Sequence, residues 1–186
     1  MNTAAIILVI IAVIAIAVAG WIYLQKEKTR KLRAKFGPEY DRLLQQERGN
    51  ARRAESILED RQKRVSKLDI RRLSPQECDR LAADWRTIQE GFVDEPRGAV
   101  EKADVLINQA LRARGYPMGD FAQRAADISV EHPAVVDNYR VAHEIAEIDK
   151  QGQATTEDLR RAMQHYRNLF EDVLETRVTH VEEVRR

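Results

Sequence analysis

The side chains that could do chemistry are concentrated in one stretch of the sequence, between Arg114 and His143. This stretch holds several groups that can donate, accept or transfer protons: Tyr116, Asp120, Arg124, Asp127, His132, Tyr139, Arg140 and His143. If the two helices that flank it pack antiparallel, Arg124 and Asp127 of the first can face Arg140 and His143 of the second. Such a network either locks two helices together or lines a small pocket for an anionic group. Both interpretations stay open for the candidate cluster of Tyr116, Arg124, Asp127, Tyr139, Arg140 and His143.

The motifs of known metal and catalytic sites are missing from the sequence. The segment that begins at His143 lacks the second histidine of the zinc-protease motif H-E-x-x-H. No glutamate stands three residues before a histidine, so the Glu-x-x-His of di-iron bundles is absent. Nucleotide-binding glycine loops and the G-x-S-x-G of hydrolases are absent too. We therefore predict no catalytic residue, no metal site and no cofactor, with a metal site at Asp127, His143 and Glu147 as a minor alternative.

The same stretch reads RGYPMGDFAQRAADISVEHPAVVDNYRVAH. Its order of RGYP, DF, RAADISV, HP and YR-x-AH resembles the signature block of a family of uncharacterised bacterial membrane or secreted proteins. In that family the block follows an N-terminal hydrophobic segment. The likeness extends to Trp85, to Phe92-Val93-Asp94 and to the segment Thr155–Phe170. The resemblance implies a bacterial envelope protein, and it implies no reaction, cofactor or catalytic residue.

Apolar side chains recur at helical spacing along the chain, and glycine and proline separate the helices. Ser74-Pro75-Gln76-Glu77 predicts a helix start, with a serine cap, a proline in the first turn and a capping glutamate. Gly115 and Pro117 end the helix that begins near Pro96, and Thr155–Asp158 begins the last one. No segment alternates apolar and polar residues as a strand does. These features predict an all-α fold, with a bundle of four to five helices over residues 73–186.

A long, basic, amphipathic stalk helix is expected before the bundle, from about Pro38 to Leu68. Its apolar residues repeat every seven positions, at Leu44, Ala51, Leu58 and Val65. Phe36-Gly37-Pro38 separates this helix from the preceding segment, and Gly49-Asn50 is a point at which it can bend or break. We predict that residues 26–72 form a basic arm around this helix.

The most apolar stretch of the chain is Ala4–Leu24, which contains no charged residue. At ~1.5 Å per helical residue, its 21 residues match a hydrocarbon core of ~30 Å. Twelve of them are Ile, Leu or Val, which together favour the membrane by about 4 to 7 kcal/mol. Residues 1–25 are therefore predicted to be a transmembrane anchor.

Six basic residues follow the apolar stretch within a short distance, and none precedes it: Lys26, Lys28, Arg30, Lys31, Arg33 and Lys35. Because Lys and Arg are enriched on the cytoplasmic side of a span, we predict an N-out anchor with a cytoplasmic C-terminal domain in the cell membrane. These six residues are also the candidate membrane surface for anionic lipids. The alternative is a cleaved signal ending at Ala17-Val18-Ala19, which would make the domain extracytoplasmic or secreted. The single cysteine, Cys78, excludes an intramolecular disulfide, as is typical of a reducing cytoplasm.

The formal net charge of +1 hides an uneven distribution of charge. Residues 26–72 carry a net charge of +8, and residues 73–186 carry −7. In the basic arm, acids stand three or four residues from the bases and no aromatic residues lie between them. We therefore do not expect nucleic acid as a partner. The spacing Ala15-x-x-x-Ala19 could let two anchors pack closely, so a homo-oligomer is an option.

These features together predict a single-pass, membrane-anchored helical interaction or scaffold module that is not an enzyme. Its expected partners are the lipid bilayer and an unknown protein. Two alternatives stay open. The first is a binder of a small anionic ligand, or an enzyme, that uses the cluster within residues 114–143, and the second is a secreted or extracytoplasmic helical protein.

Overall fold

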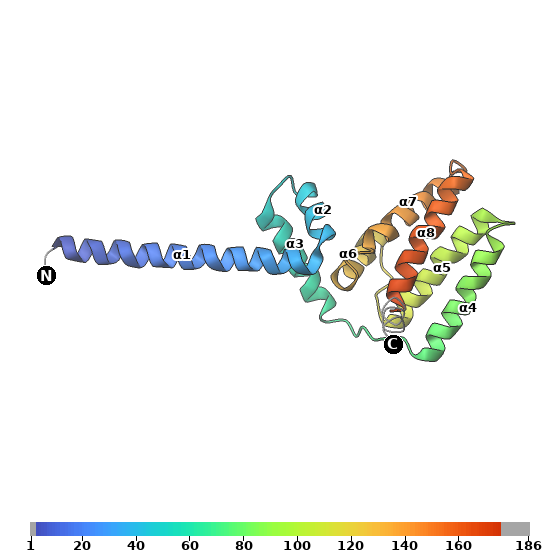
Figure 1. Ribbon diagram of the computed structural model, residues 1–186, viewed down its shortest axis with the longest axis horizontal. Coiled ribbons are helices and arrows are strands. Elements are labelled where there is room, and N and C mark those ends of the chain that lie inside the picture. Colours follow the sequence, from blue (N-terminus) through green and yellow to red (C-terminus); the bar gives the residue numbers. More distant parts are fainter. Residues whose placement is uncertain (1–2, 176–186) are drawn as a thin grey trace, which may run out of the picture. The chain divides into compact units, whose positions relative to one another are not determined.

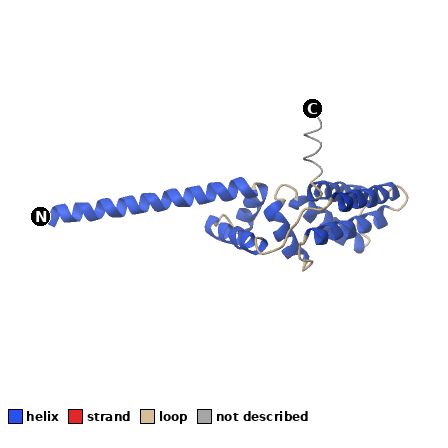
Figure 2. Cartoon of the chain, turned by 90° about the horizontal axis from the view of Figure 1, so that it is seen from below, coloured by secondary structure: helices blue, strands red, loops and turns tan. Residues whose placement is uncertain are grey.

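The chain is helical, with short loops between the helices. The computed structural model describes the backbone of residues 3–175 and the side chains of residues 11–175. This part of the chain contains eight helices and no strand (Figure 2). The helices are α1 (Thr3–Phe36), α2 (Pro38–Gln46), α3 (Ala51–Val65), α4 (Pro75–Gly91), α5 (Pro96–Arg114), α6 (Phe121–Glu131), α7 (Val136–Lys150) and α8 (Thr156–Val173). The all-α prediction is confirmed.

The helices belong to two compact units, which meet inside α3 between Ser56 and Ile57. In the first unit, Gly37 separates α1 from α2 with a φ of +48°, a conformation that favours glycine. Glu55 joins the three helices of this unit, because it accepts hydrogen bonds from Thr29 Oγ1 (2.6 Å) and Tyr40 OH (3.2 Å). The buried apolar residues of the unit are Leu32, Phe36, Tyr40, Leu43 and Ala54.

The predicted long helix from Pro38 to Leu68 is wrong, because the chain divides it into α2 and α3. Arg48 and Gly49 have φ values of +54° and +82°, so neither continues a right-handed helix. The Gly49 N–H donates to the carbonyl of Leu44 at 2.8 Å, as in the left-handed closure of a helix C-terminus. The break occurs where the sequence has Gly49-Asn50, and it allows α2 and α3 to fold back instead of forming a stalk.

In the second unit, α8 packs against both α5 and α7, while α4 packs on α5 and α6 on α7 (Figure 1). Trp85 of α4 stacks on Phe170 of α8, with ring centroids 4.9 Å apart. The largest fully buried side chains of this core are Tyr139, Tyr166, Leu81, Ile107, Leu111, Ile128, Leu169 and Val100. The five helices α4–α8 are the predicted bundle.

Capping side chains that are visible in the sequence fix the starts of two bundle helices. Ser74 and Glu77 form a reciprocal capping box at α4, and Thr155 and Asp158 form another at α8. Asp120 caps α6 by accepting the N–H of Gln123 at 2.8 Å. The two capping boxes agree with the predicted helix starts.

The described part of α1 before the basic cluster exposes apolar side chains. From Ile11 to Leu24, the large apolar side chains are between 44% and 72% exposed. Within the described residues, none of the helices combines the length and the apolar character needed to cross a membrane. The predicted span, Ala4–Leu24, begins among residues whose side chains lie outside the described part.

Candidate functional site

The six candidate residues of the second unit lie on the loop after α5, on α6 and on α7. The structure brings three of them together around Phe121, namely Arg124, Tyr139 and His143. The others, Tyr116, Asp127 and Arg140, have different partners.

Arg124 and Tyr139 begin a chain of hydrogen bonds that crosses the bundle. Arg124 Nε donates to Tyr139 OH at 2.7 Å, and Tyr139 OH donates to Asn108 Oδ1 at 3.2 Å. Asn108 Nδ2 then donates to Asp104 Oδ2 (3.1 Å), and Tyr166 OH donates to Asp104 Oδ1 (2.8 Å). Burial raises the pKa of Tyr139 to about 12 and also raises the pKa of Tyr166. Both phenols therefore stay protonated, and the chain connects α5, α6, α7 and α8.

His143 packs against an aromatic ring rather than against another polar candidate. Its ring stacks on Phe121, with centroids 3.7 Å apart and an interplanar angle of 12°. Burial lowers the pKa of His143 below its ordinary value, which favours the neutral ring. Its Nε2 lies 3.9 Å from Glu147 on the next turn of α7.

Asp127 is buried and binds an arginine that the sequence analysis did not select. Arg64, on the part of α3 that belongs to the second unit, reaches Asp127 Oδ1 with Nε at 2.8 Å and Nη2 at 2.7 Å. Gln123 Nε2 also donates to this carboxylate at 3.0 Å. Arg140 donates to Asp137 at 2.6 Å. The expected face-to-face pairing of Asp127 with Arg140 is therefore replaced by a contact between α3 and α6.

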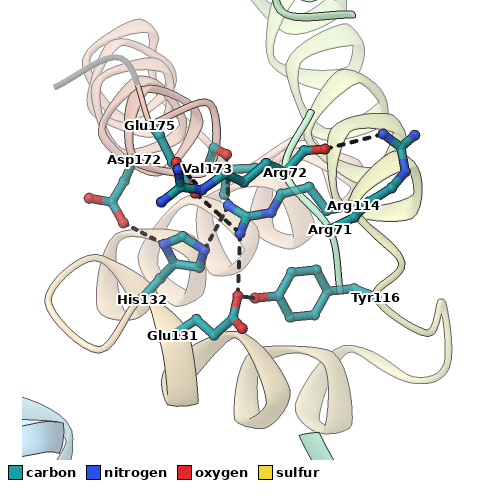
Figure 3. A network of polar contacts seen from close by, with 9 residues as sticks. All are labelled: Arg71, Arg72, Arg114, Tyr116, Glu131, His132, Asp172, Val173 and Glu175. Carbon is teal, nitrogen blue, oxygen red and sulfur yellow. Dashed lines mark hydrogen bonds and ion pairs between the residues drawn. The ribbon is translucent and has the colours of Figure 1, made fainter. Parts of the chain in front are cut away.

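A second arginine network lies at the C-terminal ends of α5, α6 and α8, and the sequence analysis missed its centre, Arg114 (Figure 3). Arg114 is only 5% exposed. Its Nη1 donates to the carbonyl of Val173 (2.9 Å) and contacts His132 Nε2 (3.2 Å). Its Nη2 donates to Glu131 Oε2 at 3.3 Å. One guanidinium thus holds the ends of three helices together.

The hydrogen bonds of His132 indicate its tautomer. Arginine can only donate, so His132 Nε2 must accept from Arg114 and cannot carry a proton. The proton is therefore on Nδ1, which donates to Asp172 Oδ2 at 2.6 Å (Figure 3). Tyr116 OH donates to Glu131 Oε2 at 2.8 Å, and burial raises the pKa of Tyr116. Arg114 Nε is buried without a hydrogen-bond partner, but the other contacts of this network join the ends of three helices, which is typical of a structural lock.

Residue 115 must be a glycine because the segment between α3 and α4 passes close to its backbone. Gly115 has a φ of +99°, and a Cβ placed there would lie 2.3 Å from the carbonyl oxygen of Asp69. The backbone N–H of Arg71 donates to the carbonyl of Arg114 at 2.9 Å. Arg114 and Gly115, the first two residues of RGYP, therefore connect the segment between α3 and α4 to the end of α5.

A cleft of about 430 Å³ lies between α5 and α7, and His143 is the one candidate residue in its lining. Five acidic and two basic side chains line it: Glu95, Glu101, Asp104, Glu147 and Asp149, with Arg97 and Lys150. This negative balance disfavours an anionic ligand. Among the residues that the structure describes, no group of three histidine, cysteine, aspartate or glutamate side chains is arranged to hold a metal ion.

The six basic residues predicted for the membrane surface lie on the C-terminal part of α1. Glu27 binds two of them, Arg30 at 3.0 Å and Lys31 at 3.8 Å, and the hydrogen bond from Arg30 lowers the pKa of Glu27. Arg33 lies 3.5 Å from Asp41, and Lys35 lies over the ring of Phe36. Lys26 has no ion-pair partner among the described residues, and it lines a groove between α1 and α3.

Comparison of the chain with protein-family models, with curated proteins and with solved structures gives no match. The family resemblance of the Arg114–His143 block therefore stays a prediction.

Proposed function

We propose that this protein is a single-pass membrane protein whose helical bundle acts as a cytoplasmic interaction or scaffold module. The observation that carries the proposal is the exposed apolar surface of α1 between Ile11 and Leu24. A continuous apolar surface of this kind is stable only when lipid or protein covers it. The basic residues that begin at Lys26 supply the charge asymmetry of a cytoplasmic flank.

The polar clusters of the bundle support a scaffold more than an enzyme. The hydrogen bonds of Arg114, Arg124 and Asp127 connect helices of the same unit. Side chains used in this way hold a rigid shape, and a rigid shape is what a binding module presents to a partner.

Membrane extraction of the full-length protein tests the anchor. Each lysine placed near the middle of a span costs about 3 kcal/mol, so Ile11→Lys with Ile14→Lys removes about 6 kcal/mol, comparable with the whole predicted insertion energy. We expect the parent protein to resist extraction by alkaline carbonate and the double lysine variant to be released. The matched control, Ile11→Leu with Ile14→Leu, should behave as the parent.

A reporter fused to the C-terminus tests the orientation. We expect a reporter that is active only in the cytoplasm to be active, because the basic flank stays on that side. Release of the parent protein by carbonate would contradict the anchor. Activity of an exported reporter would contradict the cytoplasmic placement and favour the secreted alternative.

A further inference from the structure

A groove of about 360 Å³ lies in the first unit, between α1 and the first turns of α3. Eight residues line it: Trp21, Ile22, Gln25, Lys26, Thr29, Ala51, Arg52 and Glu55. Its α1 side includes the last residues of the apolar stretch and the first of the basic cluster. The groove therefore spans the boundary between the apolar and the charged parts of α1.

Two cations line the groove without an ion-pair partner among the described residues, Lys26 and Arg52. The guanidinium of Arg52 lies over the ring of Trp21, 5.7 Å from its centroid, so it is held at the groove by a cation–π contact. The N-terminus of α3, which contributes Ala51 and Arg52 to the lining, also favours negative charge through the helix dipole.

Glu55 is the one acidic residue in the lining, and its carboxylate already accepts hydrogen bonds within the first unit. It is only 3% exposed, and its Oε1 accepts hydrogen bonds from Thr29 and Tyr40. The bond from Thr29 joins α1 to α3, and the bond from Tyr40 joins α2 to α3. The walls of the groove are therefore positioned by hydrogen bonds within the first unit. Among the described residues, the two cations and the amide of Gln25 are polar lining groups without a hydrogen bond or ion pair.

We propose that this groove binds the headgroup of an anionic phospholipid. The phosphate would lie between Lys26 and Arg52, and the acyl chains would continue along Ile22 and the exposed apolar surface of α1. A ligand with both a negative head and an apolar tail fits this combination, whereas a soluble anion would leave the apolar wall uncovered. The proposal rests on the membrane anchor proposed above.

Tryptophan quenching in vesicles tests the proposal on the full-length protein. The chain has two tryptophans, so Trp85→Phe leaves Trp21, in the groove, as the single fluorophore. The protein is reconstituted in phosphatidylcholine vesicles that contain phosphatidylglycerol, with bromine labels on one lipid or the other. We expect brominated phosphatidylglycerol to quench Trp21 more strongly, per mole of labelled lipid, than brominated phosphatidylcholine does.

Arg52 and Arg53 provide a matched pair of variants. Arg53 binds Glu47 at 2.8 Å and does not line the groove. We expect Arg52→Gln to lower the preference for phosphatidylglycerol roughly fivefold, and Arg53→Gln to leave it unchanged. Lys26→Gln, which removes the other cation of the groove, should also lower the preference. Circular dichroism of each variant confirms that the helices are retained.

The outcomes separate this proposal from the anchor. If Trp21 is quenched equally by either lipid, or if both arginine variants lose the preference equally, the groove is not a lipid site although the anchor stands. If the protein does not float with vesicles and neither lipid quenches Trp21, the anchor itself fails.

Discussion

Two arginines of the second unit, Arg114 and Arg124, each stand at the start of a polar network, and the two networks differ in burial and charge. Arg114 is 5% exposed and contacts a carboxylate, a histidine and a backbone carbonyl. Arg124 is half-buried, and its Nε donates to the neutral phenol of Tyr139. Because its charge is the more deeply buried, Arg114 should contribute more to stability than Arg124.

Replacing Arg114 should have the largest effect on folding. Arg114→Met leaves His132 Nε2 and the carbonyl of Val173 without their donor, and two buried acceptors left unpaired, at about 1 to 3 kcal/mol each, cost roughly 2 to 6 kcal/mol. We expect this loss in the free energy of unfolding, measured by urea titration of the full-length protein in detergent. Fluorescence in a Trp21→Phe background reports the second unit, because Trp85 stacks on Phe170 in its core.

The control for this prediction is an exposed arginine of the same bundle. Arg167 binds Glu171 at 2.6 Å with its side chain 57% exposed. Exposed pairs of this kind contribute about 0.2 to 1 kcal/mol, so Arg167→Ala should change stability little. An equal loss for Arg114→Met and Arg167→Ala would contradict the structural role of the Arg114 network.

Replacing the phenol of Tyr139 should have an intermediate effect. Tyr139→Phe keeps the buried ring but removes the hydroxyl that joins Arg124 to Asn108. A buried polar group left without its partner costs about 1 to 3 kcal/mol, so we expect a loss in that range in the same urea titration. Phe121→Leu, which keeps an apolar side chain of similar size against Tyr139, tests whether ring packing accounts for the loss instead. A Tyr139→Phe variant as stable as the parent would show that the hydrogen-bond chain adds nothing.

The sequence was sufficient to predict the all-α fold and the capping boxes, because both depend on residues close together in the chain. Ser74 with Glu77 and Thr155 with Asp158 are local patterns, and each forms as expected. Gly49-Asn50 was recognised as a point where the helix could bend or break, but the direction of the chain after it depends on distant contacts such as the hydrogen bond from Thr29 of α1 to Glu55 of α3. Local patterns therefore predicted which residues form helices better than they predicted whether one helix continues into the next.

The candidate site was only partly predictable, since its contacts join residues far apart in the chain. Arg64 and Asp127 are 63 residues apart, and His132 and Asp172 are 40 apart. Arg114 opens the RGYP segment, yet the sequence offers no sign that α8 supplies a carbonyl to it. The one usable signal was that His132 and Glu131 stand together at a helix end, where polar side chains often meet the ends of other helices.

Acidification should give the smallest effect, through the two histidines whose pKa is lowered by burial. Burial against Phe121 lowers the pKa of His143, so at falling pH the unfolded chain takes up a proton at His143 before the folded protein does. Above its ordinary pKa of 6.5 the residue is neutral in both states and has no effect, and stability is lost as the pH falls below that value. We expect urea titrations between about pH 7.5 and 5.5 to show a small decline in the free energy of unfolding, with a shallower slope for His143→Gln. His165, whose pKa burial also lowers, supplies the rest of the slope, so His143→Gln combined with His165→Gln should be flatter still. A slope unchanged in both variants would place the pH dependence on groups other than His143 and His165.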